Sequence, residues 1–326
     1  MSDAPSGFLL LDKPAGWSSH RVVSRVRRWL GTRKVGHAGT LDPMATGVLV
    51  VGIGPSTRLL TFAVGLDKTY TATVRLGAST PTDDADSAPD RFAPDGALSG
   101  LGEARIDTAL RGLSGRIHQR PSAVSAIKVD GRRAYARVRA GEDVELAARP
   151  VTVSRFERLS GTRHATVADD AGATRAVVDV DVVVDCSSGT YVRALARDLG
   201  DALGAFGHLT ALRRTRVGGF ALEDARAVPD FDEDAPTPDV VPPAAAAAAL
   251  LPVIPVSAVQ AEHLRHGRFL MAADVTDPAP AATAVEGVGE APFAAIREAA
   301  DGAAGDLVAV LDRRGDSLKP RLVFPA

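Results

Sequence analysis

Hydrophobic residues follow both strand-like and helix-like periods along the first 220 residues. Within residues 68–76, every second side chain from Tyr70 to Leu76 is apolar or aromatic, and threonines and Arg75 occupy the positions between them. This period of two predicts a half-buried strand. Residues 178–186 repeat the pattern with alternating valines and aspartates, and residues 48–53 form a mostly apolar run of strand length. Three strands are therefore predicted in this part of the chain.

Two other segments have the spacing of amphipathic helices. Ser18 and Ser19 can cap a helix that carries apolar residues from Val22 to Leu30 on one side, and Gly31 is expected to end it. A second helix is expected from Val192 to Leu203, with Thr190 as its N-cap. Because the strands and helices do not alternate regularly, the pattern predicts an α+β fold with a mixed, largely antiparallel central sheet flanked by helices.

A change in composition suggests how the 326 residues are divided. Residues 230–251 begin with acidic residues and prolines and end in a run of six alanines, which is typical of a linker followed by a short helix. We therefore expect a large domain at 1–230, a linker at 231–251 and a small β-rich domain at 252–326, with strands near 305–311 and 321–324. The acidic, alanine-rich segment 166–173 is expected at a hairpin tip or in a surface insert.

Composition excludes several classes of protein. Hydrophobic residues make up 45% of the chain and charged residues 24%, as in globular proteins. Cys186 is the single cysteine, so an internal disulfide framework and a C-x-x-C zinc site are excluded. No apolar run approaches the roughly 20 residues that cross a bilayer, and the N-terminal region does not resemble a signal peptide. We expect a cytoplasmic protein without membrane association.

The distribution of charge is more informative than the formal net charge of -2. Basic residues gather at 20–34, 111–139 and 213–216, whereas acidic residues gather at 83–86 and 230–239. Segregated cations of this kind are typical of a phosphate-binding face. Solvated helix faces are the alternative interpretation of any one cluster.

Several short motifs do not carry a function on their own. The Gly52-Ile53-Gly54 fragment lacks the third glycine of a dinucleotide site, and His263 and His266 have no third metal ligand nearby. Asp83, Asp84 and Asp86 are expected in a solvated loop rather than around a cation. No metal and no cofactor are therefore expected.

The segment 33–47 differs from these motifs. Gly36, Gly39 and Gly47, together with Pro43, predict an irregular loop that holds Asp42 between a basic helix and a buried strand. A loop aspartate in such a setting is either an ordinary turn residue or a catalytic carboxylate.

Five separate blocks of sequence resemble, in order, the bacterial TruB family of tRNA pseudouridine synthases. They are GFLLLDKPAGWSS (7–19), GHAGTLDPMATG (36–47), DKTY (67–70), LGASTPTDDAD (76–86) and CSSGTYVR (186–193). The resemblance covers nearly all of residues 7–220. A weaker match, QRPSAVSAIKVDG (119–131), departs from the family pattern at Ser122 and Val124.

The resemblance implies an enzyme that isomerises uridine 55 in the T-loop of tRNA, with a pseudouridine-synthase fold and a PUA-like RNA-binding domain at 252–326. It implies that Asp42 is the catalytic carboxylate, that Tyr70 packs on the flipped uracil and that Arg193 pairs with Asp42. It also assigns His37, Tyr191 and Leu212 to substrate binding, and an inserted RNA-gripping thumb loop to about 111–148. The expected RNA-binding residues are Arg33, Lys34, Arg116, Lys128, Arg132, Arg133, Arg213 and Arg214.

The chemistry is compatible with these residues. The reaction transfers no external group and needs no redox change, and a free carboxyl group is already ionised at neutral pH. Attack at C1′ of the ribose, attack at C6 of uracil and a glycal route all remain open. The partner is expected to be the T-arm of tRNA, bound by a monomer without an obligate protein partner. Two alternatives are a tRNA-folding chaperone whose chemistry is incidental, and a guide-RNA-dependent relative that modifies ribosomal RNA.

Overall fold

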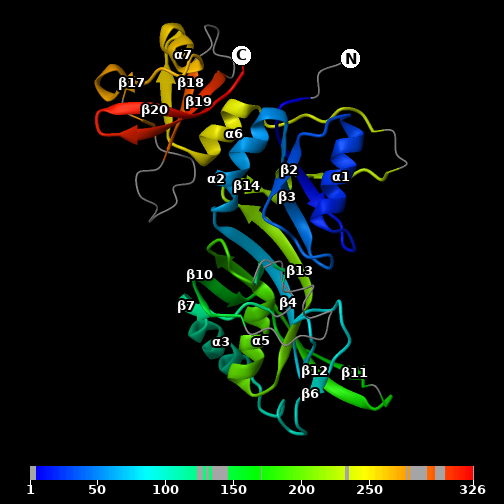
Figure 1. Ribbon diagram of the computed structural model, residues 1–326. Coiled ribbons are helices and arrows are strands. Elements are labelled where there is room, and N and C mark those ends of the chain that lie inside the picture. The colour runs from blue at the N-terminus through cyan, green and yellow to red at the C-terminus, as the bar shows by residue number, and fades with distance from the viewer. Residues whose placement is uncertain are drawn as a thin grey trace. The chain divides into compact units, whose positions relative to one another are not determined.

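The computed structural model describes residues 5–122, 128–129, 132–133, 146–169, 171–231, 235–276, 278–279, 292–297 and 305–325. The chain forms two compact units (Figure 1). Unit 1 comprises residues 1–42, 47–66 and 216–326, and unit 2 comprises residues 43–46 and 67–215. Each unit thus combines segments that lie far apart in the sequence.

The N-terminal strands of unit 1 are buried on both faces. Strand β1 (Gly7–Lys13) pairs antiparallel with β3 (Thr46–Ile53) and parallel with β15 (Arg226–Ala227), while β2 (Val35–Ala38) pairs antiparallel with β3. Leu9 and Leu11 pack with helix α1 (Ser19–Trp29) in one core, and Phe8 and Leu10 belong to a second core. Burial on both faces explains why residues 48–53 are a continuous apolar run.

Helix α1 has the ends that its sequence predicts. The Ser18 hydroxyl accepts a hydrogen bond from the Arg21 amide at 3.1 Å, which caps the first turn. Gly31 has a φ of 60° just after the helix, in the left-handed region that favours glycine.

The C-terminal part of unit 1 is a five-stranded sheet with the order β16-β18-β19-β20-β17. Its strands are β16 (Val253–Val256), β17 (Leu270–Met271), β18 (Phe293–Arg297), β19 (Asp306–Arg314) and β20 (Ser317–Val323), and helix α7 (Ala258–Arg265) packs on them. The expected strands near 305–311 and 321–324 correspond to β19 and to the end of β20. The β-rich character of this part is confirmed.

The region expected to be a linker makes extensive contacts. The Trp29 indole donates to the carbonyl oxygens of Ala235 and Pro236, at 2.9 and 3.0 Å. The alanine run forms helix α6 (Pro243–Leu250), which lies in the same core as β1, β3 and β19. Smaller helical elements of unit 1 are η1 (Gly54–Leu59), α2 (Leu60–Val64), η2 (Leu222–Asp224) and η3 (Ala272–Asp274), and β14 (Phe220–Ala221) pairs with Arg216 and Val217.

Unit 2 is built on a largely antiparallel sheet with the strand order β13-β4-β12-β10-β7. These strands are β4 (Lys68–Leu76), β7 (Gly115–Gln119), β10 (Arg149–Arg158), β12 (Thr174–Cys186) and β13 (Gly207–Val217). The alternation predicted for 68–76 and 178–186 is confirmed by strictly alternating burial along β4 and by the cross-strand pairs between β4 and β12. Strand β11 (Arg163–Ala168) forms a hairpin with β12, and its tip lies at the expected acidic segment.

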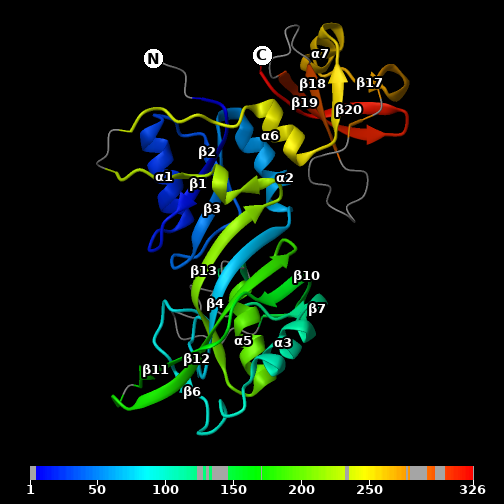
Figure 2. The same ribbon diagram turned by 180° about the vertical axis from the view of Figure 1, so that it is seen from behind.

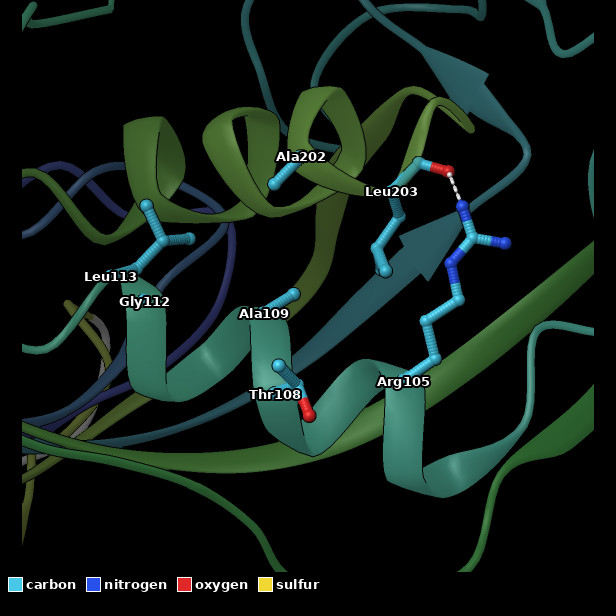
Figure 3. Close-up of a pocket in the computed structure, with 7 residues that line it drawn as sticks. All are labelled: Arg105, Thr108, Ala109, Gly112, Leu113, Ala202 and Leu203. Carbon is cyan, nitrogen blue, oxygen red and sulfur yellow. Dashed lines mark hydrogen bonds between the residues drawn. The ribbon is translucent and has the colours of Figure 1, made fainter.

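Helices α3 (Glu103–Gly112) and α5 (Val192–Leu203) lie side by side in unit 2 (Figures 1 and 2). A cavity of about 410 Å³ lies between them, where Arg105 donates to the Leu203 carbonyl oxygen at 3.0 Å (Figure 3). None of the predicted site residues lines this cavity. The short hairpins β5 (Ala78–Ser79)–β6 (Arg91–Phe92) and β8 (Lys128–Val129)–β9 (Arg132–Arg133) complete the described strands of unit 2.

Helix α5 corrects one detail of the sequence-based prediction. Its N-cap is Tyr191, and no side chain caps the first turn, so the expected Thr190 cap is wrong. At its other end, a Cβ on Gly200 would lie 2.1 Å from the Phe206 carbonyl carbon. Only glycine allows α5 to approach the start of β13 so closely.

Candidate active site

The loop that carries Asp42 is tied to the first turn of α1. Asp42 is half-buried in an irregular segment between β2 and β3, and Leu41 before it is buried. The Ser19 hydroxyl accepts a hydrogen bond from the Leu41 amide at 2.9 Å and donates one to the Leu41 carbonyl oxygen at 3.1 Å. Both polar backbone groups of the residue before Asp42 are thus bound by a single side chain.

His37 lies on β2, opposite Val51 of β3. Its ring meets that of His20 edge to face, with centroids 5.9 Å apart and planes at 81°. The sequence analysis did not identify His20, which is the second residue of α1. The only sequence signal for His20 is its place at the start of a basic helix. Arg33 and Lys34, just before β2, are exposed.

Four of the predicted substrate-binding residues lie in unit 2: Tyr70, Tyr191, Arg193 and Leu212. Tyr70 lies on β4 opposite Val184 and is 8% exposed. Leu212 is buried on β13, and its carbonyl oxygen accepts a hydrogen bond from the Thr46 hydroxyl at 3.5 Å. Thr46 also accepts from Arg213 at 3.2 Å. Residues 43–46, which directly follow Asp42 in the chain, therefore belong to the same unit as these side chains.

Arg193 occupies the first turn of α5, where the helix dipole disfavours a cation and a nearby anion is expected. Within unit 2, Asp84 supplies a negative charge close to Arg193: its Oδ2 lies 3.5 Å from the Arg193 Nε. Both side chains are buried. The Arg193 Nη1 also donates to the Thr82 carbonyl oxygen at 2.8 Å. The segment 82–84 therefore binds the Arg193 guanidinium through one backbone carbonyl group and one carboxylate.

The interpretation of the 83–86 segment as a solvated loop is wrong for its first two residues. Asp84 is 2% exposed and Asp83 9% exposed. Burial raises the pKa of Asp83 above its ordinary value, against the opposing charges of Arg197 and Arg193. Arg197 lies 3.2 Å from Asp83 and also donates to the Arg120 carbonyl oxygen. Internal arginine partners, which the sequence alone does not show, explain this burial.

A second backbone contact holds the start of α5. Gln119, the last residue of β7, is 2% exposed. Its amide donates to the Tyr191 carbonyl oxygen at 3.0 Å and accepts from the Tyr191 amide at 2.8 Å. Gln119 was not predicted from the sequence, because its partner lies 72 residues further along the chain.

Two cations are buried in the sheet of unit 2. Arg214 is 1% exposed, so its side chain is not available for a surface phosphate contact. Burial, together with the charge of Arg214, lowers the pKa of Lys68 to about 8. Cys186 is paired with Lys68 across β12 and β4, and burial raises the pKa of its thiol to about 12.

The remaining predicted RNA-binding residues lie near the inserted segment. Arg116 is exposed on β7. Lys128, Arg132 and Arg133 lie on the β8–β9 hairpin, where Lys128 is opposite Arg133. Residues 123–127, 130–131 and 134–145, which make up half of the expected thumb loop, lie outside the described residues.

The described residues contain no group of three or more histidine, cysteine or acidic side chains arranged to hold a metal ion. Within the same residues, no helix combines the length and the hydropathy that a membrane span requires.

Residues 27–192 match the family model described as TruB family pseudouridylate synthase (N terminal domain). Residues 193–233 match the model described as tRNA pseudouridylate synthase B C-terminal domain. Together the two matches span most of unit 2 and the Asp42 loop, and they define a pseudouridine synthase, which is an isomerase. The chain belongs to the TruB family, as the sequence blocks predict.

Curated relatives match nearly the whole chain. A tRNA pseudouridine synthase B of Arthrobacter sp. (strain FB24) is 52% identical over 319 residues, which cover 98% of this chain and 96% of the relative. One from Cutibacterium acnes (strain DSM 16379 / KPA171202) is 55% identical over 279 residues, covering 85% of this chain and 90% of the relative.

Solved structures support the fold. The structure of a Cbf5-Nop10-Gar1 complex matches with a TM-score of 0.68 at 24% identity, over 98% of this chain and 85% of the matched chain. An H/ACA RNP bound to a substrate RNA containing 2'-deoxyuridine matches with a TM-score of 0.65 at 23% identity, with the same coverage. The predicted α+β pseudouridine-synthase fold is confirmed.

Proposed function

We propose that this chain converts uridine 55 in the T-loop of tRNA to pseudouridine, and that Asp42 is its catalytic carboxylate. Membership of the TruB family carries this proposal, together with relatives about half identical that are named tRNA pseudouridine synthase B. The local structure supports the choice of Asp42, because this carboxylate lies on an irregular loop whose preceding residue is fixed from α1.

The reaction is balanced without any added group. The bond between C1′ and N1 breaks, a bond between C1′ and C5 forms, the C5 proton leaves to solvent and N1 gains a proton. Asp42 acts by attack at C1′, by attack at C6, or in a glycal route in which a base removes the C2′ proton. In each route the enzyme must hold the detached or activated uracil while it turns.

The proposed substrate-binding residues of unit 2 suit that task. Tyr70 stacks on the flipped uracil, and Leu212 and Tyr191 line the substrate site with it. Arg193 is proposed to pair with the Asp42 carboxylate. Its ion pair with Asp84 supports this role by fixing the guanidinium before substrate arrives. His37 takes the stacking position left by the flipped base.

Base flipping requires more than one stacking contact. Extruding a nucleotide costs a few kcal/mol, and stacking on one aromatic ring returns about 1–3 kcal/mol. Phosphate contacts must supply the remainder, and they weaken as salt rises. We propose Arg33, Lys34, Arg116, Lys128, Arg132, Arg133 and Arg213 for these contacts. Arg214 is left out because it is buried.

We further propose that residues 111–148 form an RNA-gripping thumb and that residues 252–326 form a PUA-like RNA-binding domain. The five-stranded sheet of the C-terminal part supports the second assignment. We expect a cytoplasmic monomer that needs no protein partner. Conversion of an isolated T-arm RNA by the purified protein tests this independence from guide RNA and partners.

The decisive experiment is Asp42→Asn, which keeps the size of the side chain and removes its charge. We expect pseudouridine formation to fall by at least roughly a hundredfold, measured as tritium release from uridine-labelled tRNA, with tRNA binding retained. Asp201→Asn on the exposed side of α5 is the matched control and should remain active. Full activity of Asp42→Asn would overturn the assignment. If this inactive variant restored a knockout strain as well as wild type, the chaperone role would be favoured instead.

A further inference from the structure

The side chain of Ser19 sits between α1 and the backbone that leads into Asp42. Ser19 is the first residue of α1, it is 2% exposed, and Leu41 is 3% exposed. A serine hydroxyl has one donor and two acceptor positions, so it can bind an amide and a carbonyl group at the same time. Its two contacts with Leu41, at 2.9 and 3.1 Å, use both capacities.

These contacts fix more than Leu41 itself. The Leu41 carbonyl group and the Asp42 amide share one planar peptide unit. A hydrogen bond to the Leu41 carbonyl oxygen therefore orients the plane from which the Asp42 backbone starts. The bond to the Leu41 amide fixes the preceding plane, so the rotation between the two planes is restrained as well. Because the loop is irregular, strand pairing does not supply this restraint.

We propose that Ser19 is a positioning residue for the isomerisation: its hydroxyl orients the peptide plane before Asp42 and thereby aims the carboxylate. The inference rests on the proposed role of Asp42. Ser19 itself does not touch the substrate. Loss of its hydroxyl leaves the charge of Asp42 intact but allows the carboxylate to turn away from the reacting carbon.

Ser18 provides a matched control because it is the neighbouring serine in the same turn. Its hydroxyl caps the helix by accepting from the Arg21 amide. Ser18→Ala removes a helix-stabilising hydrogen bond, and Ser19→Ala removes the two bonds to the loop. A difference in activity between the two variants, at a temperature where both are folded, isolates positioning from stability.

The experiment measures single-turnover pseudouridine formation and tRNA binding for both variants. For Ser19→Ala we expect a rate roughly tenfold to a hundredfold lower, as for other small misplacements of a catalytic group, with the Kd for tRNA within about twofold of wild type. Ser18→Ala should keep the rate within about twofold. Amide hydrogen exchange at Leu41 and Asp42 should accelerate in Ser19→Ala alone.

The outcomes separate this inference from the proposed function. If Ser19→Ala reacts at the wild-type rate while Asp42→Asn is inactive, the positioning role is wrong and the role of Asp42 stands. If both serine variants slow equally, helix stability explains the effect and the inference is also wrong. Should Ser19→Ala fail to fold, Ser19→Cys serves instead, because a thiol keeps the volume but is a weak hydrogen-bonding group. A wild-type rate for Ser19→Cys would then overturn the inference.

Discussion

The backbone before Asp42 and the first turn of α5 are held by different kinds of contact. In unit 1, an uncharged serine binds both polar groups of Leu41. In unit 2, Gln119 binds both polar groups of Tyr191, and ion pairs lie beside the same helix: buried Arg193 beside Asp84, and half-buried Arg197 beside Asp83. Neutral contacts are insensitive to pH and salt, whereas buried charges are costly when one partner is lost. The two regions should therefore respond differently to mutation and pH.

The largest expected effect follows from removing the charge of Asp84. Asp84→Asn removes a buried negative charge beside the buried Arg193 guanidinium, which should lower the free energy of unfolding by about 3–5 kcal/mol. Denaturant unfolding measures the loss. Asp169→Asn is the control, because its ion pair with the exposed Arg175 is screened by solvent and should contribute little to stability. Equal losses in the two variants would show that burial does not set the energy of these pairs.

Gln119→Met should have a smaller effect, because it breaks neutral hydrogen bonds. Leaving the Tyr191 amide and carbonyl groups without this partner should cost about 2 kcal/mol in the free energy of unfolding. Gln260 in α7 also makes two hydrogen bonds to backbone groups, but at the surface. Gln260→Met should cost less than about 1 kcal/mol, since water can replace its bonds. A Gln119→Met variant as stable as Gln260→Met would contradict this reasoning.

The smallest effect concerns pH. The pKa of Lys68 is about 8 in the folded protein, against an ordinary value of 10.5. As pH rises above 8, the folded protein loses this proton while the unfolded chain keeps it, so the unfolded chain binds more protons and stability rises. Between pH 8 and pH 9 the gain should be about 1 kcal/mol.

Cys186 opposes this gain, because its thiol, with an ordinary pKa of 9.0, ionises in the unfolded chain in this range but stays protonated in the folded protein. The two contributions cancel only at roughly one pH unit above 9, where the trend reverses. Lys68→Met should remove the gain below pH 9, as measured by denaturant unfolding at several pH values. A stability that stayed flat from pH 8 to pH 9 in the wild-type protein would exclude a lowered pKa for Lys68. No comparable titration is expected for the Ser19 contact, which has no ionisable group.

Local patterns predicted much of the fold. The Ser18 cap, the alternation along β4 and β12 and the helix in the alanine run all depend on residues close together in sequence. The Asp42 loop was predicted from its glycines and proline. What the patterns missed depends on distant partners: Ser19 contacts a residue 22 positions away, and Asp84 and Gln119 contact α5 from more than 70 positions away.

The wrong expectations have the same origin. Thr190 looks like an N-cap, but the N-cap of α5 is Tyr191, whose backbone amide donates to the Gln119 side chain. The sequence around Asp83 and Asp84 predicts a solvated loop, because it does not show that arginines of α5 pair with both carboxylates. A charged residue is buried only where a partner of opposite charge lies beside it in the folded protein, and local sequence does not show that partner.

The shared core of unit 1 has a consequence for biosynthesis. Phe8 of β1 packs in one cluster with helix α6 and with Val310 and Phe324, which follow much later in the chain. Part of this face of β1 and β3 therefore stays uncovered until residues 244–324 have been translated. During that interval the nascent chain exposes apolar surface, so the core of unit 1 can be completed only late in synthesis.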